Sequence, residues 1–179
     1  MPADTADHLA AITAAAGQVR DPELPMLTLA DLGVLRGIGV EPGPDGEVVV
    51  ASITPTYSGC PATAAMRGDL LRRLREAGCA RVEVRLVLDP PWSSDWISAH
   101  GRDALRAAGI SPPGRAPDDD GGPVPLTLLT GAPGDRPAPP CPRCGCAQTR
   151  VTSRFGPTAC TALYRCTACL EPFEHVKEI

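Results

Sequence analysis

Two Cys-x-x-Cys pairs near the carboxyl end constrain this chain more than any other feature of its sequence. Cys141 and Cys144 form the first pair, Cys166 and Cys169 form the second, and residues 145–165 separate them. Two residues between thiols allow one tight turn to direct both sulfurs at one metal ion, and Gly145 suits such a turn. The spacing is typical of a zinc ribbon, so we predict a closed, structural four-cysteine Zn(II) site.

A segment rich in proline and glycine precedes these pairs. Residues 111–140 contain nine prolines and five glycines, which exclude a continuous helix or strand. We therefore predict a domain at residues 1–110, a linker at 111–140 and a metal-stabilised domain at 141–179. The apolar patch at 124–129 is expected to pair as a short strand or to dock on a neighbour. The last domain is too short to bury a sufficient core, so the metal must hold it together.

Two further cysteines lie in the carboxy-terminal domain, and their roles stay open. Cys160 is a candidate for an additional thiol ligand, and Cys146 directly follows the first pair. An iron-sulfur cluster that uses some of these thiols is the alternative to zinc, although the spacing does not match a ferredoxin run. The simpler interpretation of each is a small buried side chain.

The first domain shows the hydrophobic periodicity of alternating helices and strands. A first helix is expected through Leu9 and Val19, capped by Asp4 or Thr5, and a third from Ser93 or Ser94 to Ala108. Between them we predict strands at 33–40 and 47–54, a helix that begins at Pro61 and stops at Gly78, and a strand at 81–88 with one buried face. This αββαβα order predicts an α+β fold with a small mixed sheet covered by helices.

Composition excludes several classes of function. The net charge of -4 and the six aromatic residues disfavour nucleic acid as a partner. No apolar run reaches the ~18 residues of a membrane span, and the first residues lack the pattern of a signal peptide. We therefore expect a cytoplasmic protein, with no membrane partner, whose cysteines are thiols or metal ligands. Whether the chain forms a homodimer is left open by the sequence.

Cys60, directly before Pro61, is the most unusual thiol in the first domain. At a helix start, free backbone N–H groups favour a thiolate and lower the pKa of a cysteine. Thr54, Asp21 and Glu23 are expected at the same edge of the sheet, where their oxygens and one thiolate would suit a transient iron or cluster site. The alternative is that Thr54 is an ordinary strand residue and that the two acids are ordinary turn residues. No histidine occupies a recognisable position for a base, so a thiol enzyme is not expected.

Longer stretches of the sequence resemble known families. Residues 155–173, which follow Cys-Pro-Arg-Cys-Gly, resemble the tail of the PaaD-type accessory subunits of the bacterial phenylacetyl-CoA epoxidase system. In the first domain, four segments resemble the signature of the metal-sulfur cluster assembly factor family: Asp21-Pro22-Glu23, Asp31-Leu32-Gly33, 54–61 and Pro91-Trp92. Two positions depart from the pattern, since Cys146 replaces a small polar residue and Leu170 replaces the glycine of the second knuckle.

The resemblance implies a role in aerobic phenylacetate catabolism. The chain would be a non-catalytic accessory protein that assembles or repairs the iron or iron-sulfur centres of the oxygenase or its reductase, which would be its partners. Chemistry in the assembly family is expected near Cys60. A general iron-sulfur carrier is the alternative function.

Overall fold

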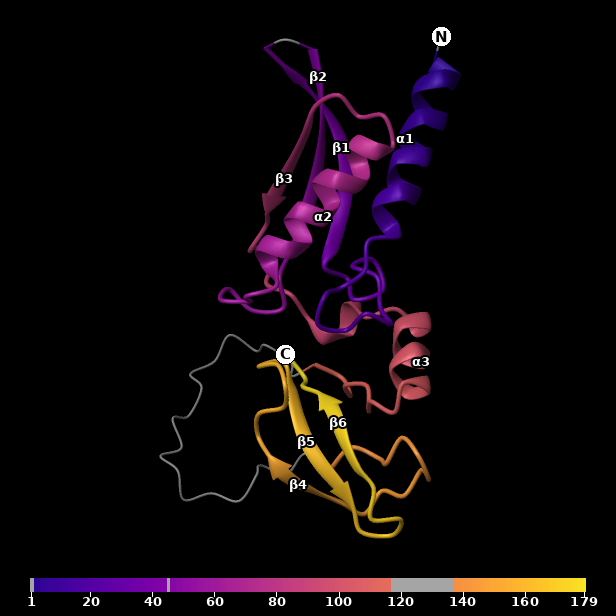
Figure 1. Ribbon diagram of the computed structural model, residues 1–179, viewed down its shortest axis with the longest axis vertical. Coiled ribbons are helices and arrows are strands. Elements are labelled where there is room, and N and C mark those ends of the chain that lie inside the picture. The colour runs from indigo at the N-terminus through magenta and orange to yellow at the C-terminus, as the bar shows by residue number, and fades with distance from the viewer. Residues whose placement is uncertain (1, 45, 117–136) are drawn as a thin grey trace. The chain divides into compact units, whose positions relative to one another are not determined.

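The computed structural model describes residues 2–44, 46–116 and 137–179 (Figure 1). The chain divides into two compact units, Met1–Ala108 and Gly109–Ile179. The apolar patch predicted at 124–129 lies outside the described residues. Each unit has its own sheet, and each is considered by itself below.

The first unit confirms the predicted α+β order. Its elements are α1 (Pro2–Gly17), β1 (Leu35–Gly43), β2 (Gly46–Ile53), α2 (Thr63–Glu76), β3 (Val82–Leu86), a 3₁₀ turn (Ser94–Trp96) and α3 (Ala99–Ala107). Helix α1 begins at Pro2, so the expectation of a cap at Asp4 or Thr5 is wrong. None of the helices in the part of the chain that the structure describes has the length and apolarity needed to cross a membrane.

The sheet of the first unit is mixed, in the order β1-β2-β3. Strands β1 and β2 form an antiparallel hairpin, and β2 pairs with β3 in parallel, from Val49 opposite Val82 to Ile53 opposite Leu86. Helix α2 connects these parallel strands and lies beside α1 along the sheet (Figure 1). The core combines side chains from α1, α2 and β2 with others from the segment between α1 and β1, and it includes Ile12, Ala16, Ala51, Ile53, Met66, Leu70, Leu74, Leu27, Leu29 and Val34.

Three local expectations in this unit are wrong. Helix α2 begins at Thr63 rather than Pro61, with Ala62 at its cap. In β3 only Val84 is buried, while Leu86 and Leu88 are exposed, because β3 is an edge strand. The third helix is interrupted, since Ser98 adopts an extended conformation and its side chain accepts the Gly101 N–H to start α3.

The second unit contains an antiparallel sheet in the order β4-β5-β6. The strands span Thr149–Ser153, Thr161–Cys166 and Pro172–Val176. Ser111, which lies at the start of the predicted linker, also pairs with this unit. The Ser111 N–H donates to the carbonyl of Glu174 (2.8 Å), and the Val176 N–H donates to the carbonyl of Ser111 (3.0 Å). The chain around Ser111 thus lies along β6.

Candidate metal centres

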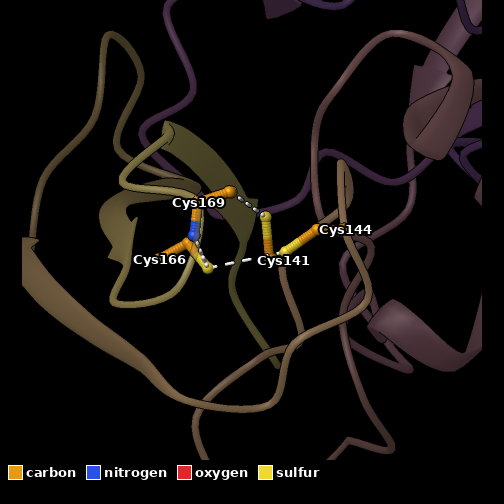
Figure 2. A group of neighbouring side chains, drawn as sticks. All are labelled: Cys141, Cys144, Cys166 and Cys169. Carbon is orange, nitrogen blue, oxygen red and sulfur yellow. Dashed lines mark hydrogen bonds between the residues drawn. The ribbon is translucent and has the colours of Figure 1, made fainter.

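The four cysteines of the two predicted pairs converge in the second unit. All four Sγ atoms lie within 4.8 Å of one another, and no other set of three or more potential ligands within residues 2–44, 46–116 and 137–179 is this close (Figure 2). The shortest distances join Cys144 to Cys166 (3.6 Å) and Cys141 to Cys169 (3.7 Å). A tetrahedral ion with metal–sulfur bonds of about 2.3 Å requires sulfurs about 3.8 Å apart. The residues therefore fit a four-thiolate ion such as Zn(II).

Two tight turns direct the sulfurs toward one another. In the first, the Gly145 N–H donates to the Cys141 carbonyl and the Cys141 N–H donates to the Cys146 carbonyl, both at 2.9 Å. In the second, the Cys169 N–H points at Cys166 Sγ (3.5 Å). The first two bonds fix the turn, while the Cys169 N–H offsets negative charge on the Cys166 sulfur and so favours a thiolate there.

The thiols of this group differ widely in acidity. The N–H of Cys169 lowers the pKa of Cys166 to about 6, with help from other donors around it. For Cys144 the N–H of Cys146 acts in the same direction, but hydrogen bonding with the neighbouring thiols and burial outweigh it and raise the pKa to about 12. Cys166 is therefore more readily ionised than Cys144, and a cation that binds the group must displace the protons that the thiols still carry.

Both turns place one residue in the left-handed region of backbone conformation. Gly145 has φ 73°, as expected for the first turn. Leu170 has φ 63°, and within the described part of the chain no other residue besides glycines has a positive φ. The leucine thus adopts the strained conformation that a glycine would accept freely.

The remaining thiols of this unit lie outside the group. Cys160 is buried, and its Sγ lies 3.1 Å from the Thr158 hydroxyl, so the structure does not place it as a fifth ligand. Cys146 packs against the small core formed by Cys141, Cys166 and Phe173. The wider thiol set of the iron-sulfur alternative is therefore not assembled among the described residues.

Cys60 lies in the loop between β2 and α2, before the helix rather than at its cap. The expectation of a lowered pKa is wrong. Burial raises the pKa of the thiol above its ordinary value, and the negative charges of Glu23 and Asp21 add to that effect. Hydrogen bonds from the Ala62 backbone and the Thr63 side chain act in the opposite direction without cancelling it. Without a cation, Cys60 is a neutral thiol at pH 7.

Asp21 and Glu23 share the turn that follows α1. Asp21 is buried, and its Oδ1 accepts the N–H groups of Glu23 and Leu24, both at 2.8 Å. Burial raises the pKa of Glu23, and the charge of Asp21 raises it further. Asp21 therefore shapes the turn, while Glu23 and Cys60 lie close enough for the carboxylate to affect the thiol. A cation near them would relieve this accumulation of negative charge.

Thr54 follows the last residue of β2 and is 1% exposed. Its N–H donates to the Val34 carbonyl (2.9 Å), whereas its Oγ1 has no hydrogen-bond partner among the described residues. A buried hydroxyl without a partner is costly to the fold, and such groups are uncommon in native structures. This hydroxyl is the most distinctive polar atom of the first unit.

One polar cluster was missed by reasoning from sequence. Asp31 accepts hydrogen bonds from Thr28, Ser98 and His100, with distances of 2.7–3.2 Å. Although burial opposes ionisation, these bonds lower the pKa of Asp31 to about 2. The cluster joins the turn before β1 to the start of α3. No spacing rule predicts it, because Ser98 and His100 lie 67 and 69 residues after Asp31 in the chain.

Comparison with family models supports a two-part chain. Residues 9–94 match the model described as iron-sulfur cluster assembly protein. Residues 129–177 match the model described as PaaD zinc beta ribbon domain. The four-cysteine group therefore lies in a ribbon of the zinc-binding type, and it is a metal-binding group.

Similarity to whole proteins covers nearly the full length. The chain is 42% identical over 169 residues to a protein of Escherichia coli (strain K12) that carries the provisional name of a 1,2-phenylacetyl-CoA epoxidase component, covering 93% of this chain and 90% of that protein.

Among solved structures, a DUF59 domain of unknown function from Bacillus anthracis is 26% identical (TM-score 0.47; 56% of this chain and 92% of that one). Rv1466 of Mycobacterium tuberculosis, described as associated with Fe-S complex assembly and repair, is 34% identical (TM-score 0.36; 58% and 88%).

Proposed function

The chain belongs to the PaaD-type family of 1,2-phenylacetyl-CoA epoxidase components, and on this premise we propose that it is a non-catalytic accessory subunit of such an epoxidase. Its task is to help assemble or repair the iron or iron-sulfur centres of the oxygenase or its reductase, in the cytoplasm. The observation that carries the proposal is the presence, in one chain, of an assembly-type domain and a PaaD-type ribbon. No part of this task requires the chain itself to turn over a substrate.

In this proposal the ribbon holds Zn(II) as a structural ion. The four thiolates of Cys141, Cys144, Cys166 and Cys169 would supply every ligand that a tetrahedral ion takes, which would leave no site for water or substrate. The described core of the ribbon is small, so metal binding supplies folding free energy. The bound ion therefore maintains the surface that meets the partner proteins.

Iron cargo is handled in the first unit, at Cys60. When an iron ion approaches, the S–H bond of Cys60 breaks, a sulfur–iron bond forms, and the proton passes to the Glu23 carboxylate or to water. The raised pKa of Glu23 favours its role as the first acceptor of this proton. Once the proton has passed on to water, the charged Glu23 carboxylate near Cys60 raises the affinity for the cation. Thr54 contributes its free hydroxyl, and Asp21 keeps the turn in place. A neutral thiol that ionises only when metal arrives suits transient holding.

Co-expression with the epoxidase components tests this assignment. Cys60→Ser is expected to lower the iron content and the activity of the purified oxygenase, while the variant itself stays folded. Cys79→Ala is the matched control, since Cys79 is a buried thiol of the same unit that lies outside the proposed site. Cys141→Ser is expected to unfold the ribbon and lose zinc. Normal oxygenase maturation with Cys60→Ser would refute the transfer site.

A general iron-sulfur carrier is the second candidate. The match of residues 9–94 to the assembly model favours it, because that domain alone carries no link to the epoxidase. Such a carrier, purified without oxygen, would be coloured and would transfer a cluster to unrelated apoproteins. One zinc and no stably bound iron per chain would favour the dedicated accessory role.

A further inference from the structure

The loop between β4 and β5 presents an aromatic ring to solvent. Phe155 is 70% exposed, more than any other large apolar side chain in the part of the chain that the structure describes. Single exposed apolar residues are common on protein surfaces, so exposure alone carries no inference. This ring is distinguished by hydrogen bonds that fix its backbone and by a cation that contacts one of its faces.

Hydrogen bonds fix the backbone on both sides of the ring. The Ser153 hydroxyl donates to the Phe155 carbonyl (2.7 Å) and accepts the Phe155 N–H (3.2 Å). The next N–H, of Gly156, donates to the Thr161 carbonyl (2.9 Å). A Cβ atom at Gly156 would overlap the Thr161 side chain, so the loop lies directly against the start of β5. The ring is therefore presented by a well-supported loop.

A cation is held against the ring. Lys177 Nζ lies 4.6 Å from the centroid of Phe155 and donates to the carbonyl of Ala159 (2.6 Å). Arg154, directly before the ring, is exposed. Two cationic residues thus lie next to the ring: Lys177 over one of its faces and Arg154 directly before it in the chain.

We propose that Phe155 is the anchor by which the ribbon unit binds a protein component of the epoxidase, inserting into an apolar pocket rimmed by carboxylates. Only the identity of the partner rests on the proposed function. A ring that is already ordered loses little conformational entropy on binding, and exposed aromatics of this kind are typical centres of binding energy. The basic surroundings select an acidic partner surface and speed encounter with it.

Binding measurements with the full-length, zinc-loaded chain test the anchor. The purified oxygenase and reductase components are immobilised, and dissociation constants are measured at two salt concentrations. Phe155→Ala is expected to weaken binding to one component about 30-fold or more. Lys177→Gln is expected to weaken it about 3-fold and to reduce its salt dependence. Val151→Ala, at an exposed apolar position of β4 in the same unit, is the matched control and should change it less than about 2-fold.

Folding and alternative partners are checked in the same experiment. Zinc content and circular dichroism of Phe155→Ala should equal those of the unsubstituted chain. Unchanged affinity of a folded Phe155→Ala overturns the proposal, as does the absence of binding to either component. Self-association that disappears in Phe155→Ala would identify a second copy as the occupant and would overturn it too. If binding depends on Phe155 but Cys60→Ser still matures the oxygenase, the transfer site fails while the anchor stands.

Discussion

Replacing Thr54 with valine should make the first unit more stable and less functional. The side chain is 1% exposed, and its Oγ1 has no hydrogen-bond partner among the described residues. Valine has nearly the same shape, and the backbone hydrogen bond to Val34 is unaffected. The substitution therefore removes one unsatisfied polar group and little else.

The size of the effect follows from the cost of burying a hydroxyl. An unpaired buried polar group costs about 1–3 kcal/mol, so Thr54→Val should raise the free energy of unfolding by about 1–2 kcal/mol. For a domain of this size, each kcal/mol raises the melting temperature by roughly 4–8 °C. If the hydroxyl contributes to the iron site, maturation of the oxygenase should fall in the same variant.

Tryptophan fluorescence during urea unfolding provides the assay. Both tryptophans of the chain, Trp92 and Trp96, belong to the first unit, so the signal reports that unit alone. Thr28→Val is the control, because the Thr28 hydroxyl donates to Asp31 (2.7 Å) and its loss should lower the midpoint. A lower midpoint for Thr54→Val would refute the reasoning. A higher midpoint with normal maturation would remove Thr54 from the site.

Three further substitutions probe backbone strain and pH dependence. Leu170→Gly should stabilise the zinc-loaded ribbon by about 1 kcal/mol, because the left-handed φ is costly for leucine and its side chain is exposed. Gly145→Ala should destabilise the ribbon for the same reason, because alanine would have to adopt the positive φ of Gly145. Calorimetry in which the two variants shift the free energy of unfolding in the same direction would contradict this account. Asp31 has a pKa of about 2 in the folded chain and 3.8 ordinarily, so its contribution of about 2 kcal/mol is present above pH 4 and is lost as the pH falls toward 2. Asp31→Asn should lower stability at pH 7 and flatten the tryptophan-monitored acid profile between pH 4 and 2; a profile as steep as the original would exclude Asp31 as its cause.

Local sequence patterns predicted much of the fold. The strands predicted at 33–40 and 47–54 and the helix predicted to stop at Gly78 follow from periodicities that one element creates by itself. The strand predicted at 81–88 is present as β3, Val82–Leu86, but the exposure of Leu86 was not predicted. Alternation indicates which residues share a face, whereas burial depends on what covers that face, and β3 lies at the edge of the sheet.

The residues of the candidate sites also differ in how far the sequence alone predicted them. The spacing of the four ribbon cysteines was sufficient by itself, because two short turns place each pair and one ion joins the pairs. For Cys60 the sequence indicated the residue and its acidic neighbours but led to the wrong sign for its pKa. That sign depends on burial and on the charges of Glu23 and Asp21, which come from a distant turn. Likewise, only the tertiary structure shows that the Thr54 hydroxyl has no hydrogen-bond partner among the described residues and that Lys177 lies on Phe155, since a contact across many residues leaves no local pattern in the chain.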